Sequence, residues 1–145
     1  MAETIVNPTE DETKVERALR NMFPSASIER TSEADDVLRL TVRGEDLEFL
    51  SNLRNLIRRE RIRNAARSIL HSRTLGQRMR FYLNKQAAFA GRISFCEAFR
   101  ESPHGPISVE IESDDAQLVI DFLAAEPSQK TYQRIMESRR RYPYP

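Results

Sequence analysis

Apolar residues recur at two spacings along the first 43 residues, and each spacing predicts one type of element. A β-prone run at residues 4–7 precedes Thr9 and Glu12, which form the T-x-x-E pattern of a helix N-terminus. Apolar side chains from Val15 to Met22 keep helical spacing until Pro24, which ends the helix. Strands are then expected at residues 27–30 and 37–42, and in the second of them apolar and polar residues alternate.

A long stretch without glycine or proline, residues 45–72, predicts helix. Its apolar residues form two sets, Leu47 to Ile57 and Ile62 to Ile69, which lie roughly 150° apart around one straight helix. A break near residues 58–61 reconciles the two sets, so two consecutive helices are predicted. Arg59, Arg63 and Arg67 follow at intervals of four, and this spacing predicts one row of guanidinium groups suited to successive phosphates.

The next segment predicts a basic β-hairpin. Residues 78–84 alternate as a strand does, a second strand is expected from about residue 87 to 95, and Asn84, Lys85 and Gln86 form the turn between them. A turn-rich loop at residues 102–106 leads to a strand at residues 107–112. Asp114 and Gln117 then resemble the start of a helix that continues to Leu123.

This order of elements predicts an α+β fold, a mainly antiparallel sheet covered by helices on one face. A single domain is expected over residues 1–125, with residues 126–145 forming a C-terminal helix or a flexible basic tail. With 39% hydrophobic and 31% charged residues, the chain has no apolar run near the roughly 20 residues that a membrane span requires. The acidic N-terminal segment does not resemble a signal peptide, so a cytoplasmic location is expected.

Charge is strongly segregated although the net charge is only +1. Eleven of the 23 basic residues lie between Arg54 and Arg92, where Glu60 is the one acid, so this segment carries a charge of +10. The segments before and after it carry −6 and −3. A local positive potential attracts polyanions whatever the net charge, which makes nucleic acid the leading candidate partner. The alternatives are a solvated helix face and a face that docks an acidic protein.

Sequence motifs for catalysis or metal binding are weak. Cys96, the one cysteine, is expected to be a small buried hydrophobe, and the two histidines lack the spacing of a zinc site. Paired acids that a metal-dependent nuclease could use occur twice, but one pair lies beside a turn and the other at a helix N-terminus, where acids cap. No metal site, cofactor or enzymatic activity is predicted; the acid pairs are Asp35 with Asp36 and Asp114 with Asp115.

Four blocks of sequence stand out: Phe81 to Cys96, Glu101 to Ile107, residues 56–70 and residues 7–11. Together they resemble an archaeal family catalogued as uncharacterised protein family 0201, and the block from Phe81 to Cys96 with Glu101 to Ile107 after it is the most characteristic. The resemblance implies a two-layer α+β domain similar to the ribosomal protein that binds 5S rRNA. It also implies RNA binding, which is predicted for the family, and association with the archaeal exosome, which has been proposed from genomic context.

The candidate site combines the arginine row with the hairpin. Tyr82 and Phe89 offer rings on which unpaired bases could stack. The alternative is that the hairpin residues Phe81, Leu83 and others form core and that the turn residues only serve the turn. The residues proposed to contact RNA are Arg59, Arg63, Arg67, Arg78, Arg80, Tyr82, Asn84, Lys85, Gln86 and Arg92.

The sequence therefore predicts a non-enzymatic RNA-binding protein, an accessory factor in RNA processing or in a ribosome-related assembly. Its partners would be single-stranded or structured RNA and exosome or ribosomal components. The second hypothesis is a protein-interaction adaptor whose basic face docks an acidic subunit. Whether two copies pair through an exposed edge strand is left open.

Overall fold

The computed structural model describes residues 1–97 and 105–125. The predicted C-terminal helix or tail at residues 126–145 and most of the turn-rich loop, including His104, lie outside the described residues. None of the described helices is both long and apolar enough to span a membrane.

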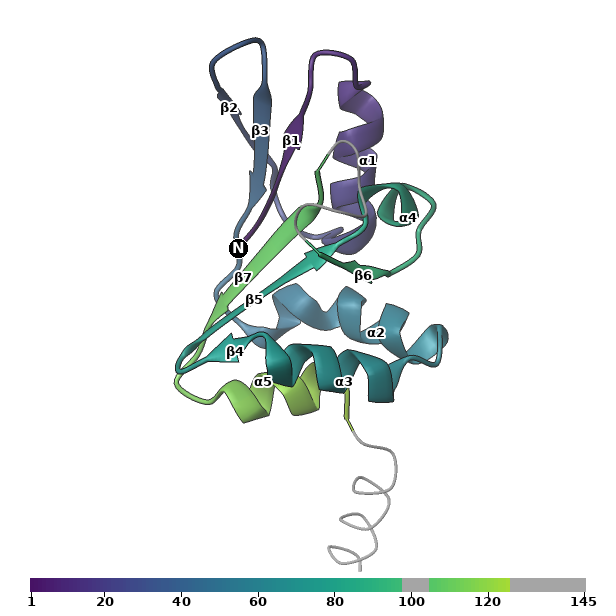
Figure 1. The fold of residues 1–145 in the computed structure, drawn as a ribbon, viewed down its shortest axis with the longest axis vertical. Helices are drawn as coiled ribbons and strands as arrows, with labels where there is room; N and C mark the ends of the chain where they lie inside the picture. The colour runs from purple at the N-terminus through teal and green to yellow at the C-terminus, as the bar shows by residue number, and fades with distance from the viewer. Residues whose placement is uncertain (98–104, 126–145) are drawn as a thin grey trace, which may run out of the picture.

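In the part of the chain that the structure describes, seven strands form one antiparallel sheet (Figure 1). Their order is β2-β3-β1-β7-β5-β4, and β6 also pairs with β5. The predicted strand at residues 107–112 is confirmed at both ends, and those predicted at residues 4–7, 27–30, 37–42 and 78–84 are present with bounds shifted by at most two residues. The strand expected from about residue 87 to 95 is wrong, and β4 was not predicted. The strands are β1 (Ala2–Val6), β2 (Glu29–Ser32), β3 (Leu38–Val42), β4 (Thr74–Leu75), β5 (Arg78–Leu83), β6 (Phe95–Cys96) and β7 (Ile107–Glu112).

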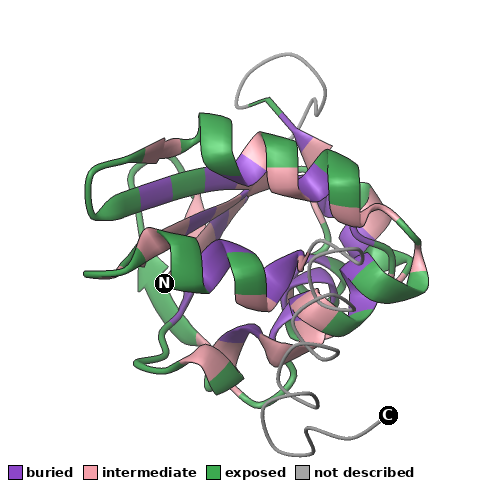
Figure 2. Ribbon diagram, turned by 90° about the horizontal axis from the view of Figure 1, so that it is seen from below, coloured by how far each residue is buried: buried purple, intermediate pink, exposed green. Residues whose placement is uncertain are grey.

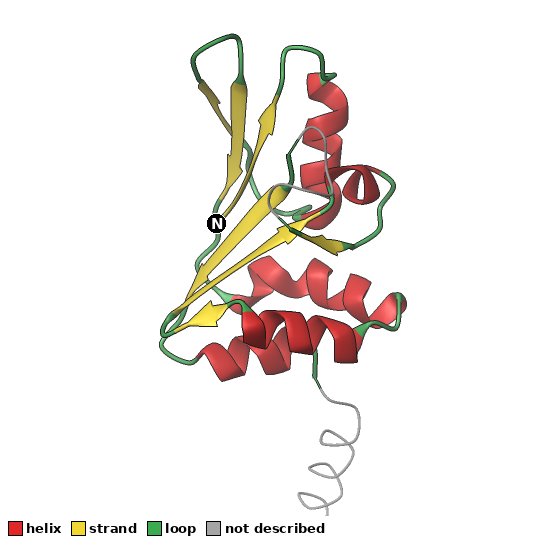
Figure 3. Cartoon of the chain, in the orientation of Figure 1, coloured by secondary structure: helices red, strands yellow, loops and turns green. Residues whose placement is uncertain are grey.

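Within residues 1–97 and 105–125, five α-helices and one 3₁₀ turn accompany the sheet (Figure 3). Two helix starts differ from the predicted capping pairs. The side chain of Asp11, not Thr9, accepts the capping hydrogen bond of the first helix, and Asp115, not Asp114, caps the last. The helices are α1 (Glu12–Met22), α2 (Ser51–Arg59), α3 (Arg63–Ser72), α4 (Lys85–Phe89) and α5 (Ala116–Leu123), and the 3₁₀ turn η1 is Leu47–Leu50.

The helices cover one face of the sheet, so the predicted α+β architecture is confirmed. Alternate residues of the central strands point inward and are buried: Met79, Phe81 and Leu83 of β5 lie beside Ile107 and Val109 of β7. Figure 2 shows buried residues on the sides of helices and strands that face one another and exposed residues on the outer sides. The opposite face of the sheet is open and polar.

Two halves of the sheet meet at a narrow seam between β1 and β7. Only two residue pairs join these strands, Ala2 with Val109 and Glu3 with Ser108. The amino group of Met1 adds a 2.9 Å hydrogen bond to the carbonyl of Glu110. On the helical side, α1 packs against α4, which lies in the other half of the chain (Figure 1). The seam is therefore held by a short stretch of sheet, by the contact of α1 with α4, and by side-chain hydrogen bonds such as the one from Thr4 Oγ1 to the carbonyl of Pro106 at 3.1 Å.

The predicted break in the long helical region is confirmed. Helix α2 ends at Arg59, and α3 begins at Arg63. Arg61 between them adopts a left-handed conformation, with φ of 57°. A non-glycine residue in this conformation costs about 1–2 kcal/mol, so the packing of α2 and α3 must hold it in place.

Candidate nucleic-acid interface

The break between α2 and α3 changes the predicted arginine row. Arg59 is the last residue of α2 and Arg63 the first of α3, so they do not follow one helical face. Arg67 is drawn inward: its side chain is only 16% exposed and donates to Asp121 Oδ1 at 2.7 Å and to the carbonyl of Ala124 at 3.2 Å. The prediction of one continuous row is wrong, because a left-handed residue interrupts the helix and Arg67 joins α3 to α5.

The predicted basic hairpin is also wrong. Strand β5 is followed by helix α4, and only the two residues of β6 return to pair with it. Asn84 is the cause: its side chain accepts a 2.9 Å hydrogen bond from the backbone N–H of Ala87, which caps a helix instead of closing a turn. Of the three predicted turn residues, only Gln86 is exposed.

Lys85 lies in the core and not at a hairpin tip. Its ammonium donates to the carbonyl of Ile5 at 2.8 Å and to the carboxylate of Glu10 at 3.2 Å. The two charged side chains are 6% and 9% exposed. Burial lowers the pKa of Lys85, and the carboxylate of Glu10 opposes that shift. The structure corrects the assignment of Lys85 as a phosphate contact, because its charge holds α4 against the end of β1.

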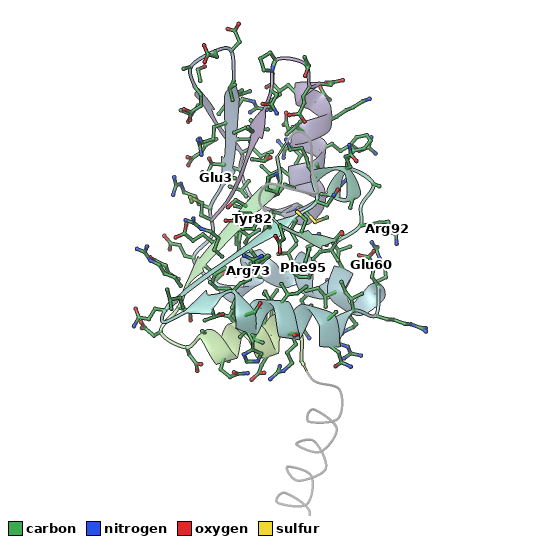
Figure 4. The ribbon with its side chains drawn as sticks, viewed as in Figure 1. Glu3, Glu60, Arg73, Tyr82, Arg92 and Phe95 are labelled. Atoms are coloured by element: carbon green, nitrogen blue, oxygen red, sulfur yellow. The ribbon has the colours of Figure 1, made fainter. Side chains whose placement is uncertain are left out.

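Three predicted residues of β5 lie on the open face of the sheet and already have partners. Arg78 pairs with Glu112 at 3.0 Å, and Arg80 pairs with Glu110 at 2.8 Å. Each glutamate lies directly opposite its arginine, on the neighbouring strand β7. Hydrogen bonding to Arg80 lowers the pKa of Glu110. The ring of Tyr82 is half-buried, 5.9 Å from the guanidinium of Arg73 (Figure 4). A phosphate on this face would have to compete with these carboxylates.

Positive charge without a carboxylate partner is concentrated where α2 meets α3, at the right of Figure 1. Of the eleven bases in the cationic segment, five form no ion pair with a described acid. One of them, Arg54, stacks over the ring of Phe122 at 5.0 Å. We call the other four the basic corner: Arg58, Arg59, Arg61 and Arg63.

Glu60 fixes the basic corner to the rest of the domain. Its side chain is 17% exposed, and its two oxygens accept hydrogen bonds from Arg92 Nε at 3.2 Å and from the backbone N–H of Ile93 at 2.7 Å. Figure 4 shows Glu60 and Arg92 side by side. Arg59 donates to the carbonyl of Gly91 at 2.9 Å. Glu60, the one acid of the cationic segment, therefore pairs with Arg92, so Arg92 lies beside the corner but does not add an unpaired cation to it.

The paired acids do not form a nuclease-like site. Asp35 and Asp36 have φ of 62° and 60°, the two left-handed residues of a type I′ turn between β2 and β3. Asp114 and Asp115 lie at the start of α5, at the opposite end of the molecule in Figure 1. The described residues contain no group of three or more His, Cys, Asp or Glu side chains placed to hold a metal ion.

Comparison with known proteins identifies the family. A family model described as RNA binding matches residues 1–112. The chain is 39% identical to a UPF0201 protein of Sulfolobus acidocaldarius over 123 residues, which cover 85% of this chain and 84% of the relative. It belongs to the UPF0201 family. A second UPF0201 relative, from Methanopyrus kandleri, is 42% identical over 131 residues, covering 85% of this chain and 82% of its own.

Solved UPF0201 structures share the fold. The crystal structure of the UPF0201 protein from Methanococcus jannaschii has a TM-score of 0.75 at 30% identity and covers 86% of this chain and 91% of its own. Another UPF0201 crystal structure has a TM-score of 0.69 at 32% identity, covering 87% of this chain. The named relatives are archaeal, as the sequence resemblance implied. The description of the UPF0201 family as RNA binding names the ligand class without assigning residues to it.

Proposed function

We propose that this protein is a non-enzymatic RNA-binding factor whose basic corner binds the phosphate backbone, acting as an accessory in archaeal RNA processing or ribosome-related assembly. One observation carries the proposal: four arginines of one helix junction have no carboxylate partner among the described residues, whereas the arginines of the sheet are paired. Guanidinium groups bind phosphate oxygens in bidentate geometry, and a cluster of them binds a backbone without reading its sequence.

The geometry of the corner supports backbone binding. Arg58, Arg59 and Arg61 are exposed, and they lie within four residues at a change of helix direction. The left-handed conformation of Arg61 turns the chain sharply, so neighbouring side chains leave the corner in different directions. If all four arginines contact phosphates of a single strand, the slope of log affinity against log salt is about −3.

Fluorescence anisotropy of labelled RNA, measured over a range of salt concentrations, tests the proposal. The test variant is Arg58→Gln with Arg61→Asn, because asparagine tolerates the left-handed conformation better than most other non-glycine residues do. The matched control is Arg78→Gln with Arg80→Gln, which also removes two arginines of the cationic segment. We expect the corner variant to reduce the salt slope by about 1.4 units for single strands and the control to leave it nearly unchanged.

Two results would contradict the proposal. Absence of RNA binding at low salt would exclude the function and favour the corner as a docking surface for an acidic protein. Equal losses in the corner variant and the control would show that total charge, and not the corner, determines affinity.

A further inference from the structure

An exposed aromatic ring lies between two cations at the contact of α1 with α4. Phe89, the last residue of α4, is 39% exposed and is the one aromatic side chain among the exposed large hydrophobic residues of the described chain. The ring centroid lies 6.0 Å from Lys14 Nζ and 5.8 Å from Arg17 Cζ, both on α1. These distances are at the outer limit of a cation–π contact. Both cations can therefore turn toward an anion, and the face of the ring stays open to a ligand.

A pocket of about 370 Å³ opens beside this ring. Its apolar lining consists of Phe89, Val15 and Ala18, and of these Phe89 has the exposed side chain. Its polar lining consists of Lys14, the amide of Gln86, the ion pair of Lys85 with Glu10, and the side chains of Thr9 and Asp11. Small-molecule sites commonly combine such a volume with an apolar lining and a few polar groups, and the flat ring gives this pocket a surface for a planar ligand.

The backbone that carries the ring is held in place before any ligand arrives. Asn21 Nδ2 donates to the carbonyls of Ala88 and Phe89 at 3.0 and 3.1 Å, which ties the end of α4 to α1. At the other end of α4, Asn84 caps the helix. A preorganised backbone loses little conformational entropy on binding.

The pocket also neighbours the basic corner. Arg59 donates to the carbonyl of Gly91, two residues beyond Phe89, and Arg92 follows directly. Cations therefore lie on both sides of the ring along the surface, with Lys14 and Arg17 on α1 and the corner at the end of α2. A strand of nucleic acid that contacts both groups of cations passes the ring.

We propose that this pocket takes one unpaired nucleobase of the RNA whose phosphates the basic corner binds. The base stacks on Phe89, the amide of Gln86 meets its polar edge, and Lys14 and Arg17 neutralise the adjoining phosphates. This inference rests on the proposed function and deepens it by naming the ligand class: single-stranded RNA in preference to duplex. A base within a duplex is stacked and paired, so it cannot enter the pocket.

The first test compares single-stranded and duplex RNA of equal length at one salt concentration. Loss of one stacked base lowers affinity roughly fivefold to more than a hundredfold, so we expect Phe89→Leu to weaken single-strand binding by at least fivefold and to leave duplex binding unchanged. Phe89→Tyr keeps the ring and should retain single-strand affinity. Leu75→Ala, at another exposed apolar side chain, is the control and should have no effect.

A second test reads stacking directly. The chain contains no tryptophan, so Phe89→Trp introduces a single indole into the pocket. We expect single-stranded RNA to quench its fluorescence and duplex RNA at equal occupancy to leave it nearly unchanged.

The two proposals fail in different ways. If Phe89→Leu binds single strands as the native chain does while the corner variant loses affinity, the pocket inference is refuted and the basic corner remains. Absence of quenching by bound single strands would also refute the pocket. If neither variant changes RNA binding, the basic corner fails as well.

Discussion

The buried ion pair between Lys85 and Glu10 gives the sharpest prediction, because it separates a structural role from an RNA contact. Lys85→Met removes the ammonium that bonds to Glu10 at 3.2 Å and to the carbonyl of Ile5 at 2.8 Å. Breaking a buried pair from one side costs about 3–5 kcal/mol. Glu10 keeps two hydrogen bonds from the backbone and side-chain amides of Asn7, at 3.0 and 2.8 Å. We therefore expect the lower value, about 3 kcal/mol.

A double-mutant cycle in urea measures the pair. Glu10→Gln removes the opposite charge, and the combined variant Lys85→Met with Glu10→Gln leaves neither charge buried alone. The combined loss should be smaller than the sum of the single losses, with a coupling energy of about 2 kcal/mol. RNA affinity is then measured by anisotropy without urea, at a temperature where circular dichroism shows that every variant is folded.

Alkaline pH provides an independent check. Burial lowers the pKa of Lys85 in the folded state below its ordinary value of 10.5. Between the folded and unfolded pKa values the unfolded chain binds more protons, so this group raises stability as pH rises through that window. The Lys85→Met variant should lack this contribution. The reasoning is refuted if Lys85→Met costs less than about 1 kcal/mol, or if the folded variant loses RNA affinity as the corner variant does.

Three further changes test other parts of the structure. Gly44→Ala places a methyl group against the ring of Phe49, so it should lower the free energy of unfolding in urea by about 1–3 kcal/mol; an unchanged midpoint would contradict the packing described. Arg61→Asn should raise stability by up to about 1 kcal/mol while lowering RNA affinity, since it relieves a left-handed arginine and removes a cation; urea unfolding and anisotropy should move in opposite directions. Hydrogen bonds from Arg30 and Arg20 lower the pKa of Glu16, so the stability it contributes is present above its ordinary value of 4.5 and is lost as pH falls through the folded value. Arg30→Gln should flatten this acid loss in urea titrations, and an identical pH profile would refute the assignment.

Elements with one strong local signal were predictable from the sequence. The strand at Ile107–Glu112 alternates strictly, and its bounds were correct at both ends. The break between α2 and α3 followed from the angular drift of two apolar sets, which no straight helix can bury on one side. The prediction for the segment after β5 was wrong because asparagine, here Asn84, is favoured both in turns and at helix N-termini. Tertiary packing decides between the turn and the helix, since α4 packs against α1 and Ala88 is buried.

The number of cations in the segment was predictable from the sequence, but which of them are free of a carboxylate partner was not. Lys85 finds its carboxylate 75 residues away in the chain, and Arg80 finds Glu110 30 residues away across a strand pair. No local pattern reports such pairings, because they depend on strand order and register. Phe89 was named as a stacking ring, but its pocket depends on the packing of α4 against α1.

Because the seam of the sheet is narrow, an RNA ligand that contacts both halves would change how easily the two halves separate. Lys14 and Arg17 belong to the half that contains β1, whereas Phe89 and the basic corner belong to the half that contains β7. An RNA strand bound across both halves stabilises their association, because it loses contacts when the halves separate. Its binding free energy then adds to the cost of that opening. The amide hydrogen of Glu110, which donates to the carbonyl of Met1 across the seam at 2.8 Å, should therefore exchange more slowly with solvent when RNA is bound, although Glu110 lies outside the proposed RNA site.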